Sequence, residues 1–324
     1  MAAEDNHIIS RDIKPGQERF LAEVLHSLKK PQKELPSKYF YDERGSALFE
    51  QICSVPEYYI PRTEQSIMLA HVDEMAELIG RNALVIEYGC GDCKKVRFLL
   101  DHLHDPSAFI PIDISREQLA EVTRELDADY PELEVLPVCA DYTSSFELPH
   151  AGKDPKRTVV FFPGSTISNF DTLPAKMFLE HLSNIAGVGG VLLIGVDLKK
   201  DVNILHSAYN DPSGVTAAFN LNILERLNRE LGCNFQLDRF QHYAFYNPRE
   251  NRIEMHLVSR CRQSVRVNNT TIKLTEGESI WTESSYKYTV EEFRQMAAAA
   301  GFHIERTWTD KQNWFSVHYA VGTD

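Results

Sequence analysis

The sequence lacks the long hydrophobic runs of membrane proteins and the basic runs of nucleic-acid-binding proteins. No stretch of about 18 apolar residues occurs, so we expect no transmembrane helix. The formal net charge is −13, whereas a phosphate backbone requires a cationic surface. Residues 1–12 also lack the apolar core of a secretory signal. These absences predict a cytoplasmic protein that binds neither membranes nor nucleic acids.

Metal-binding patterns are also lacking. The chain has 6 cysteines and 12 histidines, and without a secretory signal we expect the cysteines to be free thiols. Cys90 and Cys93 form one C-x-x-C, which fits a redox dithiol or half of a zinc site. No second C-x-x-C or close histidine pair completes a set of four ligands. We therefore expect no metal, and interpret the two cysteines as small side chains in a tight turn.

From residue 83 onward, short apolar runs alternate with helical patterns such as 115–128 and 173–186. This alternation is typical of a parallel sheet that is covered on both faces. A late helix over 290–300 and two closing strands near the end belong to the same sheet. The earlier strands are predicted at 83–88, 108–113, 133–139, 157–162 and 191–197.

The remaining segments predict a second domain. An amphipathic helix at 215–231 precedes a strand at 252–260 and a hairpin around Asn268-Asn269. Near the N-terminus, helices are predicted at 17–30 and 64–79, with an irregular, aromatic segment between them. We interpret 62–199 and 286–324 as the sheet domain. The second domain, which binds substrate, then consists of 1–61 and the insertion 200–285.

The first strand of the sheet ends in Glu87 and opens into a glycine turn with Gly89 and Gly91. Glycines let the backbone approach a ligand. Asp113, at the end of the next strand, is placed to accept hydrogen bonds from ribose hydroxyl groups. Position 94 is lysine instead of the third glycine of the dinucleotide pattern. Glu87 repels phosphate but suits a cationic amine. The pattern therefore favours S-adenosylmethionine (SAM) and a class I methyltransferase.

Two further strand ends carry polar residues that suit this ligand. Asp141 and Tyr142 follow the third strand, where they are placed to contact the adenine amine and ring. Asn169 lies in the polar loop after the fourth strand and offers both a donor and an acceptor to a methyl acceptor. Asp113, Asp141 and Asn169 also fit ordinary turn residues, so the position alone leaves both interpretations open.

Longer segments carry a more specific pattern: Lys38-Tyr39-Phe40-Tyr41-Asp42 with Gly45-Ser46, Pro56-Glu57-Tyr58-Tyr59 with Arg62-Thr63-Glu64, Phe162-Pro163-Gly164-Ser165-Thr166-Ile167-Ser168-Asn169, Gly214-Val215-Thr216-Ala217-Ala218-Phe219-Asn220, and Arg252-Ile253-Glu254-Met255. Together they resemble the histidine-specific Nα-methyltransferases of ergothioneine biosynthesis, which trimethylate L-histidine to hercynine. The resemblance runs from about residue 35 to about residue 320. Fungal tryptophan-type N-methyltransferases share this architecture.

The resemblance implies a Rossmann-like, class I SAM-dependent α/β sheet with a second substrate-binding domain. The implied cofactor contacts, with the two loop residues read above, are Glu87, Gly89, Gly91, Lys95, Asp113, Asp141 and Tyr142. The contacts to the amino-acid end of the substrate are Asn169 and Tyr209, with Gly164 and Tyr41 close by. The contacts around the imidazole ring are Tyr58, Met255, Glu283 and Ser285. The family often has serine-like residues at Cys90 and Cys93, and phenylalanine at Tyr142.

Methyl transfer requires a neutral α-amine, so we expect activity to rise with pH. Asn169 and Tyr41 are expected to act at the amine by hydrogen bonding, without a strong base. The resemblance implies that Glu283 accepts a ring N–H and that Met255 closes the apolar wall, which would favour histidine over tryptophan. The residues alone also fit a solvated strand residue at Glu283 and a core methionine at Met255.

The residues alone leave other functions open. These are methylation of another small amine such as tryptophan, a nicotinamide-dependent oxidoreductase and a catalytically silent binding module. The oligomeric state is also open, and a monomer is plausible.

Overall fold

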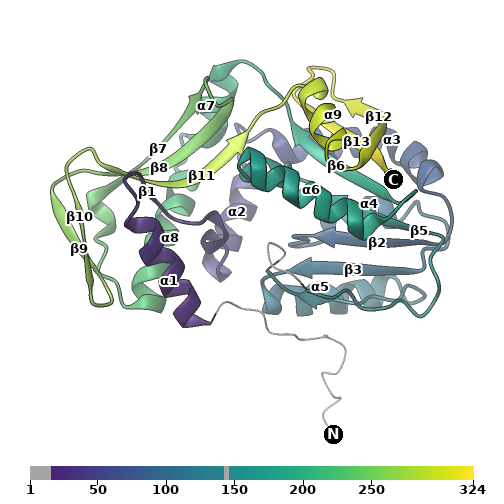
Figure 1. The fold of residues 1–324 in the computed structure, drawn as a ribbon, viewed down its shortest axis with the longest axis horizontal. Coiled ribbons are helices and arrows are strands. Elements are labelled where there is room, and N and C mark those ends of the chain that lie inside the picture. The colour runs from purple at the N-terminus through teal and green to yellow at the C-terminus, as the bar shows by residue number, and fades with distance from the viewer. Residues whose placement is uncertain (1–15, 142–145) are drawn as a thin grey trace, which may run out of the picture. The chain divides into compact units, whose positions relative to one another are not determined.

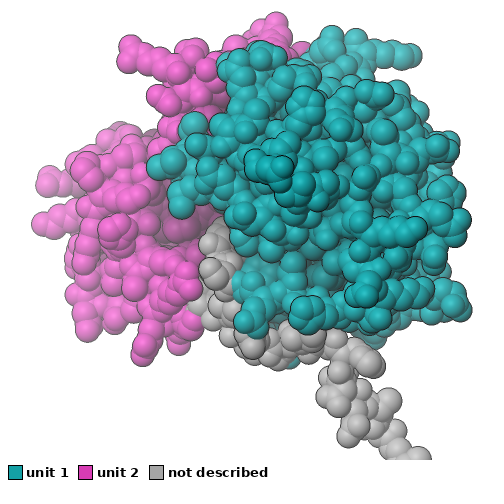
Figure 2. All heavy atoms as spheres, turned by 45° about the vertical axis from the view of Figure 1, so that its right-hand side comes forward, with its two compact units in different colours: residues 1–14, 62–198, 288–324 teal, residues 15–61, 199–287 magenta. Residues whose placement is uncertain are grey.

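The computed structural model describes residues 16–141 and 146–324. The described chain divides into two compact units, which are coloured separately in Figure 2. Unit 1 contains Arg62–Leu198 and Tyr288–Asp324, and unit 2 contains residues 16–61 and Lys199–Lys287. No helix of the described residues is both long and apolar enough to cross a membrane.

Unit 1 is built on a sheet with the strand order β12-β13-β6-β5-β2-β3-β4 (Figure 1). The strands β2 to β6 run parallel, whereas β13 is antiparallel to β6 and β12 is antiparallel to β13. The order reverses at β2, which lies between β3 and β5. This topology confirms the predicted Rossmann-like, class I sheet, and ligands of such sheets bind at the carboxyl ends of the strands beside the reversal. The strands are β2 (Ala83–Tyr88), β3 (Ala108–Asp113), β4 (Val138–Cys139), β5 (Arg157–Phe162), β6 (Val191–Asp197), β12 (Phe302–Thr309) and β13 (Phe315–Gly322).

Helices cover this sheet because its strands are apolar along almost their whole length. Every residue of β6 is buried. Helices α6 (Thr172–Ala186) and α9 (Val290–Ala298) supply side chains to one continuous core cluster with the strands, and α6 lies over the sheet in Figure 1. Helix α5 (Arg116–Asp129) packs against β3. The other helices that belong mainly to this unit are α3 (Ile60–Ile79) and α4 (Lys94–Leu100).

Two elements of unit 1 differ from the sequence-based expectation, and proline explains both. The strand predicted at 133–139 is reduced to β4 and an isolated bridge between Phe109 and Val135. Pro137 interrupts this run because it has no backbone N–H to donate to the sheet. The helix predicted at 64–79 begins earlier, at Ile60. Pro61 is tolerated there because the first turn of a helix leaves its N–H groups without intrahelical partners.

Unit 2 combines a small sheet of order β1-β11-β8-β7 with a separate β9–β10 hairpin. Strands β7, β8 and β11 are antiparallel, and helices α7 and α8 pack against β7 and β8. The predicted hairpin and the helix at 215–231 are confirmed, whereas α2 lies in the segment expected to be irregular. The elements are α1 (Gln17–Leu28), β1 (Lys33–Glu34), η1 (Ser37–Phe40), α2 (Glu43–Ser54), α7 (Val202–Tyr209), α8 (Val215–Leu231), η3 (Leu237–Arg239), β7 (Phe240–Asn247), β8 (Arg252–Ser259), β9 (Gln263–Val267), β10 (Thr270–Leu274) and β11 (Ser279–Tyr286).

Candidate active site

The glycine turn after β2 is tied to the end of β3. Gly89 and Gly91 adopt φ values of 69° and 55°, a region that favours glycine. The Gly91 N–H donates to Asp113 Oδ2 at 3.0 Å, and the Ser115 N–H donates to Asp113 Oδ1 at 2.9 Å. A Cβ atom on Gly91 would meet no heavy atom within 4 Å. The turn therefore has a fixed shape with open space beside it, as a ligand loop requires.

Glu87 is a buried carboxyl group beside this turn. Its side chain is 2% exposed, and Oε2 has no hydrogen-bond partner among the described residues. Burial raises the pKa of Glu87 well above its usual value, against the lowering effect of the Lys95 charge. A buried, unsatisfied carboxyl oxygen is costly unless a ligand completes it. The amino group of SAM is a cation that fits this position.

Lys95 is held by Glu64, a residue to which the sequence analysis assigned no role. Lys95 Nζ lies 2.6 Å from Glu64 Oε2, and the Gly164 N–H donates to Glu64 Oε1 at 2.8 Å. Gly164 has φ 79°, and a Cβ atom there would lie 3.1 Å from Lys95 Nζ. Glu64 thus connects α4, which follows the glycine turn, with the loop after β5. The only signal in the sequence was its place in the Arg62-Thr63-Glu64 segment.

The loop after β5 is fixed by serine hydroxyl groups. Ser165 has φ 58°, its Oγ lies 2.5 Å from Ser168 Oγ, and it accepts the Asp197 backbone N–H at 2.8 Å. Asn169 ends the 3-10 helix η2 (Thr166–Asn169) and is half-buried. Its amide makes no side-chain hydrogen bond to any other described residue. A rigid loop therefore presents an amide that is available to a ligand.

Unit 1 also contains the end of β4 and the C-x-x-C. Asp141 is buried two residues after the end of β4, while Tyr142 lies outside the described residues. Cys90 and Cys93 are free and buried. A hydrogen bond to Cys93 and burial raise the pKa of the Cys90 thiol well above its usual value, which opposes the thiolate form that redox chemistry needs. In the described part of the chain, no three His, Cys, Asp or Glu side chains are grouped like metal ligands.

In unit 2, the Asp42–Gly45 turn fixes the start of α2. Asp42 Oδ1 accepts the Gly45 N–H at 2.7 Å and the Asn222 amide at 2.8 Å, while Arg229 pairs with Oδ2. A Cβ atom on Gly45 would lie 1.7 Å from the Phe40 carbonyl oxygen, so only glycine fits. This turn explains why Asp42 and Gly45 occur in one motif.

The turn places Tyr41 at the edge of an aromatic cluster. The Tyr41 ring lies 5.7 Å from Phe49 and 5.9 Å from Phe219. Phe49 lies 6.5 Å from Tyr58, and Tyr58 meets Tyr209 edge-on at 5.9 Å. Burial, together with the charges of neighbouring groups including Tyr209 and Glu283, raises the pKa of Tyr58 well above its usual value. Tyr58 therefore stays protonated and able to donate.

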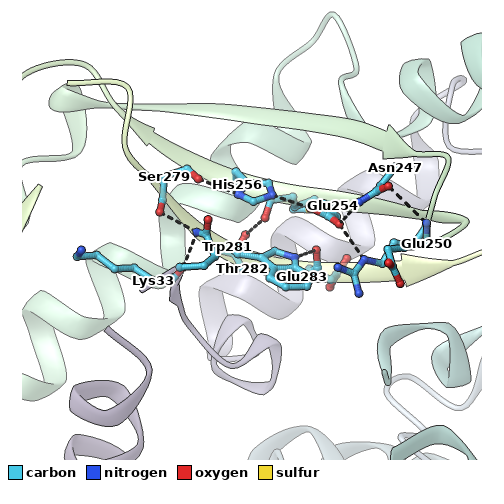
Figure 3. A network of polar contacts seen from close by, with 12 residues as sticks. Lys33, Asn247, Glu250, Glu254, His256, Ser279, Trp281, Thr282 and Glu283 are labelled. Atoms are coloured by element: carbon cyan, nitrogen blue, oxygen red, sulfur yellow. Dashed lines mark hydrogen bonds and ion pairs between the residues drawn. The ribbon is translucent and has the colours of Figure 1, made fainter. Parts of the chain in front are cut away.

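A β-bulge in β11 determines which side chains share a face with this cluster. Trp281 pairs with His256, whereas Glu283 pairs with Met255, so the bulge turns Trp281 and Glu283 to opposite faces of the sheet. Trp281 Nε1 donates to the Glu283 carbonyl at 2.9 Å, as Figure 3 shows. Thr282 Oγ1, in the bulge, donates to the Met255 carbonyl at 3.0 Å. Without the bulge, Glu283 would lie on the same face of the sheet as Trp281.

The face with Met255 also carries Ser285, whose Oγ accepts the Tyr209 hydroxyl at 2.8 Å. Burial raises the pKa of Glu283 to about 7, against the lowering effect of the Lys287 charge. Unit 2 thus brings together Tyr41, Tyr58, Tyr209, Met255, Glu283 and Ser285, and we call these six residues the acceptor cluster. It combines an apolar wall, hydroxyl groups and a carboxyl group that changes charge near neutral pH.

Lys287 lies against the acceptor cluster and was missed by the sequence analysis. Its side chain is 1% exposed, and its Nζ donates to Ser285 Oγ at 2.7 Å and to Tyr209 OH at 3.1 Å. Lysines are usually exposed, so the residue type did not point to a buried position in a site. Its spacing of two from Ser285 was the only available signal.

Comparisons with known proteins identify the family and the fold. A family model described as histidine-specific methyltransferase, SAM-dependent, matches residues 20–321. Histidine N-alpha-methyltransferase of Mycobacterium tuberculosis (strain CDC 1551 / Oshkosh) is 40% identical over 92% of this chain and 94% of its own length. Ergothioneine biosynthesis protein 1 of Neurospora crassa is 28% identical over 86% of this chain and 32% of its own length. The solved structure of a possible exported protein from Bordetella parapertussis shares the fold, with a TM-score of 0.50, 13% identity and coverage of 94% and 87% of the two chains.

Proposed function

The chain belongs to the family of SAM-dependent, histidine-specific methyltransferases, and we propose that it trimethylates the α-amine of L-histidine to hercynine, the first step of ergothioneine biosynthesis. The observation that carries this proposal is the bulge that sets Glu283 beside Met255 and Ser285. The 40% identity with a histidine N-alpha-methyltransferase over nearly the whole of both chains supports it.

For the cofactor, we assign the amino group of SAM to Glu87 and its ribose to Asp113. The orphan oxygen of Glu87 and the open space beside Gly91 support these roles. Gly89, Asp141 and Tyr142 are assigned to the remainder of the cofactor, and Lys95 acts through its ion pair with Glu64. When bound, SAM supplies an electrophilic methyl group on sulfur.

For the acceptor, we assign the imidazole ring to the acceptor cluster. A neutral imidazole has one N–H and one lone pair. Glu283 accepts the ring N–H, and Ser285 or Tyr58 donates to the other nitrogen, while Met255 packs against the ring. Indole has no second nitrogen to accept a donor, so a site built in this way rejects tryptophan.

At the reacting nitrogen, the chain's task is orientation. From the family resemblance, we assign contacts to the amino-acid end of histidine to Asn169, with Gly164 in the same loop, and to Tyr209 and Tyr41. The amine must lose its proton before attack, which its own pKa allows at mildly basic pH. Asn169 and Tyr41 then act by holding the lone pair in line, and such positioning contributes about 7–11 kcal/mol in favourable cases. The proposal includes a cytoplasmic location.

The test is to incubate the purified protein with isotope-labelled SAM and histidine, and to analyse the products by mass spectrometry. We expect histidine to gain three methyl groups, through mono- and dimethylated intermediates. S-adenosylhomocysteine should raise the melting temperature, whereas NADH should not. Unchanged histidine in the presence of bound cofactor would overturn the proposal.

A further inference from the structure

Lys287 closes a triangle of hydrogen bonds with two members of the acceptor cluster. Its Nζ donates to Ser285 Oγ at 2.7 Å and to Tyr209 OH at 3.1 Å, while the Tyr209 hydroxyl donates to Ser285 Oγ at 2.8 Å. The lysine backbone N–H is held by the Asn251 carbonyl at 2.7 Å. All three side chains are buried, so water does not compete freely for these bonds.

The triangle fixes the direction in which the Ser285 hydroxyl can act. An ammonium group only donates, so both hydroxyl oxygens must accept from it. Ser285 Oγ accepts from Lys287 and from Tyr209, which occupies both of its lone pairs. Its own hydrogen has no acceptor among the described residues. Ser285 is therefore left with a single capacity toward a ligand, which is to donate.

We propose that Lys287 is a positioning residue that holds Ser285 as a hydrogen-bond donor, so that the acceptor cluster offers imidazole one donor at Ser285 and one acceptor at Glu283. This inference rests on the proposed function and deepens it. A neutral imidazole ring, with one N–H and one lone pair, matches the pair in a single tautomer. A ring with two N–H groups, or with no second nitrogen, does not match.

The charge of Lys287 also supports the acceptor of the pair, Glu283. It lowers the pKa of Glu283 against the effect of burial, and so keeps more of this carboxyl group in the charged form, which is the stronger acceptor. One buried cation thus sets the hydrogen-bonding direction at both residues that meet the ring.

The test compares two substrates: histidine and a pyrrolylalanine, whose ring keeps the N–H but has carbon in place of the second nitrogen. In the wild type, the analogue leaves the Ser285 hydrogen unpaired, and we expect a kcat/KM about 10- to 100-fold lower than for histidine. Lys287→Met releases the hydroxyl and should bring this ratio close to one. Ser285→Ala should do the same, and the double variant should show no further change.

Lys33→Met is the matched control, because Lys33 is a partly buried lysine of the same sheet that pairs with Glu278 outside the cluster. Its substrate ratio should equal that of the wild type. Binding of S-adenosylhomocysteine reports folding, and if Lys287→Met fails to bind it, Lys287→Gln replaces it. The Gln side chain can also accept, so the ratio should fall there too.

A substrate ratio that stays at the wild-type value in the folded Lys287 variant would overturn the positioning role. Failure of the proposed function looks different, because the wild type itself would then leave histidine unmethylated.

Discussion

Each unit contains a carboxyl group with a raised pKa, and the two units handle it in different ways. In unit 1, Glu87 keeps an oxygen without a partner, because the nearby Lys95 is paired with Glu64. In unit 2, the charge of the buried Lys287 lowers the pKa of Glu283. We infer that unit 1 leaves its positive charge to be supplied by the cofactor, which is a cation. Unit 2 supplies its own positive charge through Lys287, because the imidazole ring that it binds is neutral.

The largest expected effect comes from removing the acceptor and the wall of unit 2 together. The double variant Glu283→Ala, Met255→Val should lose preference for histidine over tryptophan by about a thousandfold, because a site built to pair a ring N–H discriminates by large factors. The measurement is kcat/KM for both amino acids. An unchanged preference would show that unit 2 does not select the ring through these residues.

The next effect concerns unit 1. Glu87→Gln keeps the shape but removes the charge, and should weaken binding of S-adenosylhomocysteine by about 10- to 100-fold, since hydrogen bonds to charged groups are worth about 1.5–3 kcal/mol. Isothermal titration calorimetry measures the change. Glu121→Gln, at an exposed glutamate of α5 in the same unit, is the control and should bind normally. Equal affinities for Glu87→Gln and wild type would remove the distinction between the two units.

The dependence of kcat/KM on pH should show the contribution of Glu283 in unit 2. Burial raises the pKa of Glu283 to about 7, and its deprotonated form accepts a ring N–H more strongly than its protonated form. Both this group and the substrate amine therefore make kcat/KM rise with pH, and the lower inflection, near pH 7, belongs to Glu283. Glu283→Gln should lose this inflection and keep the rise due to the amine. A variant profile identical to the wild type would contradict the assignment.

The smallest effect is on stability. Because the folded-state pKa of Glu283 is raised from 4.5 to about 7, its contribution is favourable below the unfolded pKa and is lost as pH rises through 7. Glu283→Gln should therefore match the wild type at pH 4 and exceed it at pH 8 by about 1–2 kcal/mol, after allowance for the group's partial exposure. Urea unfolding at the two pH values gives the comparison. Equal stability of the variant and the wild type at pH 8 would mean that burial does not destabilise the charged form of Glu283.

The fold of unit 1 was largely predictable, because the sequence patterns that identify its strands and turn are short and local. The Glu87–Gly91 turn directly follows β2, β3 comes next after one helix, and near-continuous apolar runs identify a covered parallel sheet. The error at β4 arose from counting apolar residues across Pro137, which cannot donate to the ladder.

The candidate site of unit 2 was less accessible, because its members meet only after folding. Asp42 is a local N-cap signal for α2, because it accepts the Gly45 N–H, but the aromatic segment around it was interpreted as irregular. Asn222 and Arg229 of α8 also hold Asp42, which no local pattern could show. Glu283 and Met255 were identified only through the family resemblance. Lys287 and Glu64 were not identified, since each acts through a partner far along the chain or in an unexpected environment.

The most direct test of the account is calorimetric titration of histidine into the S-adenosylhomocysteine complex of the wild type and of Glu283→Ala. We predict that the variant binds histidine about 100-fold more weakly, because the ring N–H loses its charged acceptor, and that its affinity for S-adenosylhomocysteine is unchanged. Equal histidine affinities in the two proteins would contradict the claim that unit 2 recognises the imidazole ring through Glu283.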